Sequence, residues 1–318
     1  MTQRRENGSR IAAGFVGGAT VRVGYFVAGA LILFAVRTMS SQELHVKWIH
    51  GSDPCRSNTD PAFQVHAFAA DTFIIRENKC INYEGPFIYL LFGNDTVFMQ
   101  DTGAAPAANS GIAFPVRETV QKVIDDWSRK HGKTGMRLLV THSHAHDDHT
   151  GGDSQFEGRL NTTVVGKKPE DVQAFFGIAN WPNQQVTLDL GNRILDIIAI
   201  PGHEASSIAV YDRKTRILLT GDTVYPGRLY IRDWPTFKSS IERLASFVKT
   251  HEVSQVLGTH IEMTTKPGVD YPIRTTYQPD EHDLQMTPAN ILELYGAVSK
   301  MGDTPVRDIH KDFIIYPR

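Results

Sequence analysis

The sequence lacks the clustered basic residues that binding to nucleic acid requires. Its 318 residues include 33 Lys and Arg against 35 Asp and Glu, which gives a formal net charge of −2 at pH 7. Affinity for DNA or RNA depends on clustered Lys and Arg side chains that release counterions from the phosphates. We find no such cluster beyond the N-terminus, so we expect no nucleic-acid partner.

Cysteine is almost absent, since Cys55 and Cys80 are the only two in the chain. Neither lies near the histidine-rich stretch described below, so we do not expect either to bind metal. In an oxidising compartment the two would close one disulfide-bonded loop, and the alternative is two unpaired thiols. Internal repeats and low-complexity tracts are also lacking. With 41% apolar residues, the chain is long enough to bury a large core.

No uninterrupted apolar run reaches the roughly 20 residues of a membrane-spanning helix. The longest, "VGYFVAGALILFAV", covers residues 23–36 and is flanked by Arg22 and Arg37. A basic flank before a short apolar run is typical of an export signal. We therefore expect residues 1–40 to be a signal peptide or a membrane anchor, with a buried helix as a further alternative. The protein would then be exported, either periplasmic or secreted, with possible membrane attachment.

The rest of the chain is predicted to contain a linker, residues 41–61, and one domain, residues 62–318. The linker prediction depends on a polar composition rich in Pro, Ser, Asn and Asp. Hydrophobic patterning predicts strands within residues 71–77, 85–93, 95–103, 136–142, 193–200, 207–212, 215–222 and 253–260. Helices are expected within residues 115–132, 236–251 and 287–302. This interleaving indicates an α/β or α+β fold with helices covering sheets.

The stretch "THSHAHDDHTGG", residues 141–152, follows the apolar run "MRLLV" and carries many metal-binding side chains. In an extended segment His144 and His146 point to the same side, so both imidazoles can reach one ion. Asp148 and His149 are adjacent and diverge, which suits a second ion nearby. The two glycines that follow are expected to permit a turn of the backbone.

A second register is possible, because His142 also forms a His-x-His pair with His144. Only the register that begins at His144 yields the pattern His-x-His-x-Asp-His. We therefore expect His142 to be structural, or to orient a neighbouring ligand through its other nitrogen.

Three further potential ligands follow predicted strands: His203 in "PGHEASS", Asp222 in "TGDTVY" and His260 in "GTH". Strand ends are where α/β sheets build their sites. Taken alone, a histidine or aspartate after a strand is usually a turn or surface residue. Together with the first loop they supply five imidazoles and two carboxylates, a donor set that zinc and similar divalent metals prefer. Asp222 has the chemistry to bridge two ions.

These motifs resemble the metallo-β-lactamase-fold hydrolase superfamily over residues 62 to about 260. The resemblance implies a four-layer αββα sandwich with a dinuclear metal site at its edge. It also implies one ion held by His144, His146 and His203, a second held by Asp148, His149 and His260, and Asp222 as the bridge. Asp101, in "DTG", would hold the loop beneath the site. The sequence "PGHEASS" departs from the usual "PGHTPGS" of the superfamily while keeping its histidine.

Within the superfamily, an aspartate at position 222 resembles glyoxalase II, lactonases and esterases more than zinc β-lactamases. The stretch after residue 260 does not resemble the glutathione-binding extension of glyoxalase II, so glutathione thioesters are not favoured. Asp222 and Tyr225 fit the Asp-x-x-Tyr spacing seen in lactonases. The alternative for Tyr225 is a core or rim residue before the Pro226-Gly227 turn.

The expected activity is hydrolysis of an ester, thioester or lactone of a small molecule. Two Zn²⁺ ions, or another divalent metal such as Fe or Mn, would lower the pKa of a shared water and supply hydroxide. Tyr225 would donate a hydrogen bond to the oxyanion, and Asp148 would orient the hydroxide and pass its proton to the leaving group. The alternatives are a β-lactamase and a mononuclear iron dioxygenase acting on persulfides, which would use only two histidines and an aspartate.

Overall fold

The computed structural model describes residue 44 and residues 46–318. The predicted signal peptide or anchor, residues 1–40, therefore lies outside the described residues. The two sheets and the helices that cover them belong to one compact unit, Ser41–Arg318. Across the described part of the chain, no helix combines the length and the apolar character needed to cross a membrane.

The first sheet has six strands in the order in which they occur in the chain. They are β1 (Phe63–Ala69), β2 (Thr72–Glu77), β3 (Phe87–Phe92), β4 (Thr96–Gln100), β5 (Arg137–Thr141) and β6 (Thr162–Val164). Neighbours from β1 to β4 are antiparallel, whereas β4, β5 and β6 run parallel. The connection from β4 to β5 passes through α1 (Val116–His131), because a parallel pair needs a crossover.

The second sheet also has six strands, in the order β13-β12-β10-β9-β8-β7. Its members are β7 (Val186–Asp189), β8 (Ile194–Ala199), β9 (Ile208–Asp212), β10 (Ile217–Gly221), β12 (Gln255–Gly258) and β13 (Gln285–Met286). A small third sheet joins β11 (Arg228–Ile231), β15 (Ile314–Pro317) and β14 (Asp308–Ile309). The parallel pair β10 and β12 is connected through α4 (Trp234–Thr250).

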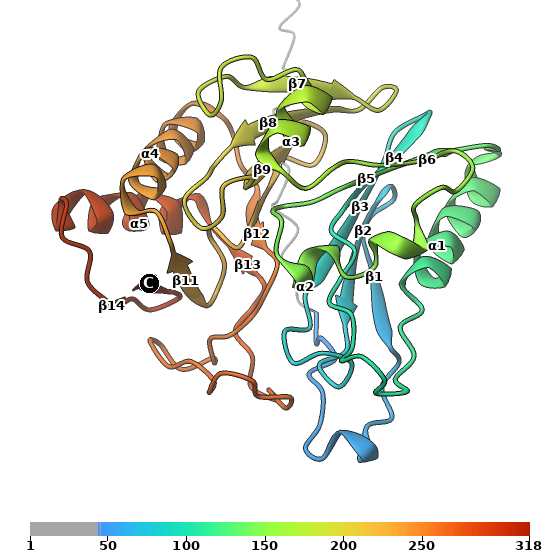
Figure 1. Ribbon diagram of the computed structural model, residues 1–318, viewed down its shortest axis with the longest axis horizontal. Helices are drawn as coiled ribbons and strands as arrows, with labels where there is room; N and C mark the ends of the chain where they lie inside the picture. Colours follow the sequence, from blue (N-terminus) through green and yellow to red (C-terminus); the bar gives the residue numbers. More distant parts are fainter. Residues whose placement is uncertain (1–43, 45) are drawn as a thin grey trace, which may run out of the picture. The chain divides into compact units, whose positions relative to one another are not determined.

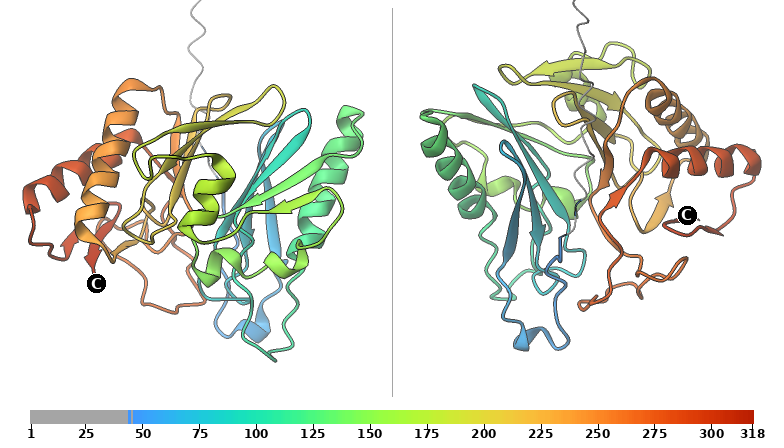
Figure 2. Two further views of the ribbon diagram at one scale, coloured as in Figure 1. Left: turned by 45° about the horizontal axis from the view of Figure 1, so that its top comes forward. Right: turned by 180° about the vertical axis from the view of Figure 1, so that it is seen from behind.

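The two large sheets pack face to face, and helices cover both outer faces (Figure 1). Successive side chains of β3 point to opposite faces of the first sheet, and both faces are covered. Phe87, Tyr89 and Leu91 belong to the core between the sheets. Ile88 and Leu90 pack on the other face, against α1. On the far side, α4 and α5 (Pro288–Met301) pack against the second sheet (Figure 2). The αββα sandwich expected from the sequence is confirmed.

The segment between residues 46 and 61, where we expect a linker or an irregular lead-in, has little regular secondary structure and is anchored to the compact unit. Trp48 is buried and packs edge-on against Phe87, with ring centroids 4.9 Å apart. The backbone N–H of Ile49 donates to the Gln64 side chain at 2.7 Å. A polar composition hid these anchors because only a few side chains of the segment are apolar. Cys55 and Cys80 form a disulfide, which is one of the two alternatives that the sequence leaves open.

The predicted strands and helices are all present, with ends shifted by a few residues, but several short elements were missed. These are β1, β6, β7, β11, β13, β14, β15, α2 (Asp147–Thr150) and α3 (Pro169–Phe176). Most are two to four residues long or half exposed, so their hydrophobic periodicity is too short or too weak to detect. Of these, β1, β6, β7 and β13 pair with strands of the two large sheets, whereas β11, β14 and β15 pair with one another.

Candidate metal centre

All seven predicted metal-binding side chains lie together at one edge of the sandwich. β5 leads into the loop that carries His144 and His146, and α2 continues that loop with Asp148 and His149. The other three follow strands of the second sheet: His203 after β8, Asp222 after β10 and His260 after β12. These three strands run in the same direction, so their carboxyl ends meet at the same edge.

Three imidazole nitrogens form the first group of donors. His144 Nε2 lies 2.8 Å from His146 Nδ1, and His203 Nε2 lies 3.2 and 3.1 Å from these two atoms. A tetrahedral zinc ion with Zn–N bonds of 2.0–2.1 Å separates its ligand atoms by roughly 3.3 Å. The triangle of nitrogens is therefore close to the size that such an ion needs.

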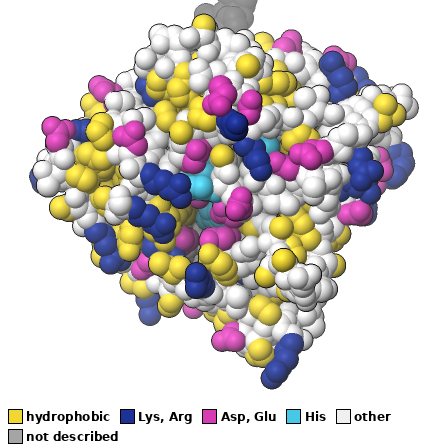
Figure 3. Space-filling model, in the orientation of Figure 1, with side chains coloured by type: hydrophobic (Ala, Val, Ile, Leu, Met, Phe, Trp, Pro, Cys, Tyr) yellow, Lys and Arg dark blue, Asp and Glu magenta, His cyan; other side chains and the backbone are white. Residues whose placement is uncertain are grey.

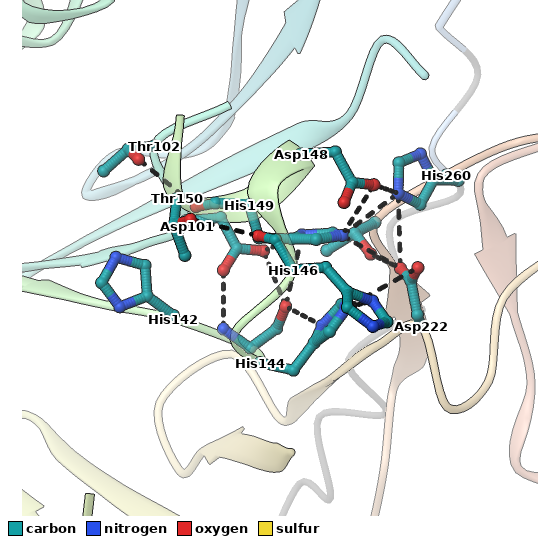
Figure 4. A network of polar contacts seen from close by, with 12 residues as sticks. Asp101, Thr102, His142, His144, His146, Asp148, His149, Thr150, Asp222 and His260 are labelled. Carbon is teal, nitrogen blue, oxygen red and sulfur yellow. Dashed lines mark hydrogen bonds and ion pairs between the residues drawn. The ribbon is translucent and has the colours of Figure 1, made fainter. Parts of the chain in front are cut away.

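The second group consists of two imidazole nitrogens and a carboxylate oxygen. His149 Nε2 and His260 Nε2 are 3.3 Å apart, and each lies 3.2 Å from Asp148 Oδ2 (Figure 4). This second triangle again has the dimensions of one face of a tetrahedral metal site.

Asp222 lies between the two triangles, with one oxygen directed to each. Its Oδ1 is 3.6 Å from His149 Nε2 and 3.4 Å from His260 Nε2. Its Oδ2 is 3.7 Å from His203 Nε2 and 4.0 Å from His144 Nε2. A carboxylate in this position has the geometry to bridge two ions.

For four of the five rings, contacts outside the cluster fix which nitrogen carries the proton. His203 Nδ1 lies 2.7 Å from the carbonyl oxygen of Tyr230, and His260 Nδ1 lies 3.2 Å from that of Glu84. Carbonyl oxygens only accept hydrogen bonds, so both Nδ1 atoms must be donors. In the neutral rings the Nε2 lone pairs then point into the cluster.

The same argument applies to His144 and His149. His149 Nδ1 donates to Asp101 Oδ2 at 2.9 Å. The Ser143 hydroxyl donates its only proton to Asp101 at 2.9 Å, so it accepts from His144 Nδ1 at 3.1 Å. Asp101 thus orients one ring directly and a second through Ser143. Its contacts match the expected role beneath the loop.

The cluster therefore gathers lone pairs and carboxylates around two points, which requires positive charge at those points. No Lys or Arg among residues 44 and 46–318 forms an ion pair with Asp148 or Asp222. Burial alone lowers the pKa of His260, but the carboxylates of Asp222 and Asp148 outweigh it and raise that pKa to about 8. The negative charges of Asp148 and Asp222 therefore favour a cation between the donor atoms, and this set of donors fits divalent metals.

His203 lies in a different electrostatic environment, although it belongs to the same cluster. Burial lowers its pKa to about 4, and the opposing field of Asp222 does not restore it. Burial likewise holds the pKa of His144 well below its ordinary value, with His149 adding to the effect. Both imidazoles are therefore neutral at physiological pH, which is the form that binds metal.

The backbone turns at the two glycines after the loop, as expected, but they are needed there for a close approach and not for an unusual backbone conformation. Gly151 and Gly152 adopt ordinary right-handed backbone conformations. A Cβ on Gly151 would lie 2.4 Å from the backbone nitrogen of Ala105, and one on Gly152 would lie 2.6 Å from the carbonyl oxygen of Thr102. The glycines therefore let the chain pass directly against the segment that carries Asp101.

His142 lies outside the cluster, as the choice of register predicts. Its Nε2 pairs with Asp153 Oδ1 at 2.9 Å, and Thr102 Oγ1 donates to the same oxygen at 2.9 Å. Figure 4 shows the ring turned away from the other histidines. His142 contributes to the packing beneath the site and orients none of the donors directly.

Tyr225 lies in the wall of the site, but its hydroxyl proton is already used. The side chain is buried, and the hydroxyl donates to the carbonyl oxygen of Arg228 and lies 3.1 Å from Glu262 Oε2. Burial raises the pKa of Tyr225 well above its usual value, with Glu262 adding to the effect. The expected free donor to an oxyanion is therefore not what the structure contains, and the contact with Arg228 is structural.

Of the groups that orient the rings, Asp101 was predicted, whereas Ser143 and the carbonyl groups of Tyr230 and Glu84 were not. Ser143 lies between His142 and His144 in the histidine motif, so its position in the sequence could have marked it as a residue that orients a ring. The carbonyls of Tyr230 and Glu84 are backbone groups on distant segments, so no pattern in the sequence marks them.

The family model described as the metallo-beta-lactamase superfamily matches residues 81–250, more than half of the chain. The chain therefore belongs to the metallo-beta-lactamase superfamily. The match begins at β3 and extends to the end of α4, so it includes every donor except His260.

Curated relatives fall into two kinds. The hydroxyacylglutathione hydrolase of Ectopseudomonas mendocina is 30% identical over 163 residues, 46% of this chain and 62% of the relative. The acyl-coenzyme A thioesterase MBLAC2 of Homo sapiens is 26% identical over 208 residues, 54% of this chain and 72% of the relative. In the first three relatives compared, the matched stretch spans less than two thirds of the relative's length.

Among solved structures, the metallo-beta-lactamase from Pontibacter korlensis superposes with a TM-score of 0.49 at 16% identity, over 74% of this chain and 99% of that one.

Proposed function

We propose that the protein is a hydrolase that uses two bound divalent metal ions, most naturally Zn²⁺, to cleave a thioester or ester of a small molecule. The observation that carries this proposal is the position of Asp222 between two triangles of donor atoms. Relatives named as an acylglutathione hydrolase and an acyl-coenzyme A thioesterase support thioesters as the substrate class.

The seven side chains have distinct tasks in this proposal. His144, His146 and His203 would hold one ion, and Asp148, His149 and His260 the other, with Asp222 shared between them. Bound ions would supply a water of lowered pKa as nucleophile and a Lewis acid for the carbonyl oxygen. Hence no serine or cysteine nucleophile is needed.

Asp148 is the residue best placed to handle a proton. Its Oδ2 faces the imidazoles of His149 and His260 at 3.2 Å each. In the described part of the chain, no hydrogen bond or ion pair engages Oδ1, and the residue lines the cleft above the cluster. Oδ1 can therefore accept a proton from the attacking water and return it to the leaving thiolate or alkoxide.

We also propose that residues 1–40 direct export. The basic flank and apolar run of that segment support it, and so does the Cys55–Cys80 disulfide, since such bonds persist mainly in oxidising compartments. Fractionation of cells, followed by N-terminal sequencing of the recovered protein, would test it. A reduced, uncleaved protein in the cytosol would contradict it.

Metal analysis combined with a substrate panel tests the proposed activity. We expect close to two equivalents of zinc per chain and hydrolysis of hexanoyl-coenzyme A or S-lactoylglutathione in preference to a γ-lactone or a β-lactam. A chelator should remove both metal and activity, and added Zn²⁺ should restore them. A single equivalent of iron, or full activity in metal-free protein, would show that the proposal is wrong.

A further inference from the structure

Two arginines stand side by side at the rim of the cleft above the metal cluster. Arg232 follows β11 and Arg318 follows β15, and these parallel strands are paired in register up to Ile231 and Pro317. The N–H of Arg318 also donates to the carbonyl oxygen of Ile231 at 2.9 Å. Both side chains are exposed, and both line the cleft of about 300 Å³ that contains Asp148, Asp222 and His260.

Neither guanidinium is neutralised within the described part of the chain. Arg318 lies over the ring of Tyr230, with 3.8 Å from Cζ to the ring centroid, and forms no ion pair there. Arg232 likewise has no carboxylate partner among those residues, and it lines the cleft together with His146.

The neighbouring Arg228 shows the contrast. It is buried and paired with Glu262 and Asp270. The two rim charges are therefore available to a ligand, whereas the third is used to hold the fold together. Figure 3 shows Lys and Arg side chains beside the hollow in which the histidines are visible.

A second cleft, of about 540 Å³, adjoins the first and shares His203 and Arg232 with it. Its wall is mainly apolar and includes Trp181, Pro182 and Pro201. A volume of this size accommodates an extended hydrocarbon group. A carbonyl held at the cluster therefore has the apolar cleft beside it, with Arg232 where the two clefts meet and Arg318 in the wall of the first cleft.

We propose, on the basis of the hydrolase function above, that the substrates are thioesters with an apolar acyl group and an anionic thiol part. The acyl group occupies the cleft at Trp181, and Arg232 and Arg318 bind the carboxylate or phosphate of the thiol part. Arginine suits this task because its planar fork of donors matches both kinds of anion.

Matched substrates test the charge preference with the acyl group held constant. The hexanoyl thioester of 3-mercaptopropanoate carries a negative charge, whereas that of 2-mercaptoethanol is neutral. With metal-loaded full-length protein, we expect kcat/KM to be at least about tenfold higher for the anionic thioester. The double variant Arg232→Gln/Arg318→Gln should lose that preference, mainly through KM. Its kcat/KM for the neutral thioester should fall by a clearly smaller factor than that for the anionic thioester.

Arg137→Gln is the matched control, because Arg137 is also exposed but begins β5, at the opposite end of the strand from the site. It should leave the values for both thioesters unchanged. If the double variant lowers both thioesters by the same factor, or neither, the anion proposal is wrong. If the wild-type protein cleaves neither thioester while loaded with metal, it is the proposed hydrolase function that fails.

Binding without turnover provides an independent measurement. Calorimetry with the inert thioether 3-(hexylthio)propanoate should give a Kd about tenfold weaker for the double arginine variant than for the wild type. Trp181→Ala should weaken the same ligand but leave 3-(methylthio)propanoate unaffected. Equal affinities of wild type and both variants for the hexyl ligand would overturn the assignment of these residues.

Discussion

The two ends of the sandwich both bury carboxylates, but they neutralise them in different ways. At the end where β8 begins and β9 ends, Arg193 donates to Asp212 through Nε at 3.0 Å and Nη2 at 2.7 Å. At the opposite end, where β10 and β12 finish, Asp222 faces four imidazoles and accepts a hydrogen bond from the Thr259 hydroxyl, and within the described part of the chain it forms no ion pair with Lys or Arg. One end therefore carries its own permanent cation, and the other has places for cations from outside.

Arg193 also shows what a purely structural charge looks like in this fold. Its side chain is fully buried, and its remaining donors reach Thr72 Oγ1 at 2.7 Å and the carbonyl oxygens of Asp71 and Phe92. These contacts join the second sheet to the first. A guanidinium cannot be exchanged, whereas neutral imidazoles with inward lone pairs form a site that can be loaded and emptied.

The largest effect is expected from His146→Ala. Removing this donor should lower hydrolysis by at least about a thousandfold and reduce the bound metal, because the first triangle loses a corner. Atomic absorption and thioester turnover would measure the two losses. His142→Asn is the control from the same loop and should retain two metal equivalents. Full activity with a full complement of metal in His146→Ala would show that His146 is not a metal ligand.

A smaller effect, but on stability, is expected at the other end. Arg193→Leu leaves Asp212 buried without its partner and should lower the free energy of unfolding by about 3–5 kcal/mol. Urea denaturation would measure the change, and the folded variant should still bind two metal equivalents. Lys122→Ala, which breaks the exposed pair with Asp126 on α1, should cost no more than about 1 kcal/mol. Loss of metal in folded Arg193→Leu would show that the two ends are not independent.

The smallest effect is expected from Tyr225→Phe, at the boundary of the metal centre. Because its hydroxyl donates to the backbone carbonyl of Arg228, the substitution should reduce stability by about 1–2 kcal/mol and leave kcat within about twofold. Thermal unfolding and thioester kinetics would distinguish these outcomes. A tenfold fall in kcat for Tyr225→Phe, at unchanged stability, would show that the Tyr225 hydroxyl donates a hydrogen bond to the oxyanion.

Spacing along the chain was sufficient to find the donor atoms. The His-x-His-x-Asp-His pattern separates His144 from His142 without a structure, because only one register supplies the adjacent aspartate and histidine. The later donors His203, Asp222 and His260 were found because each follows a recognisable strand. Strand ends in one sheet meet at one edge, so local patterning was enough to predict that they converge.

Groups that act through the backbone, or through packing between distant segments, were not predictable. Nothing in the polar segment 46–61 marks Trp48 as a core residue, since its partner Phe87 is nearly 40 positions away. The Asp-x-x-Tyr spacing suggested a donor at Tyr225, but the direction of that hydroxyl depends on the turn that brings Arg228 beneath it.

The sequence by itself determined which side chains can bind metal, the strands that carry them and the sandwich that those strands build, because each depends on residue type and short-range periodicity. Only the tertiary structure decided which carboxylates are paired with arginine, which ring nitrogens face the cluster and which arginines remain free at its rim. Those properties depend on contacts between segments that are far apart in the chain. These contacts form only when the two sheets pack against each other.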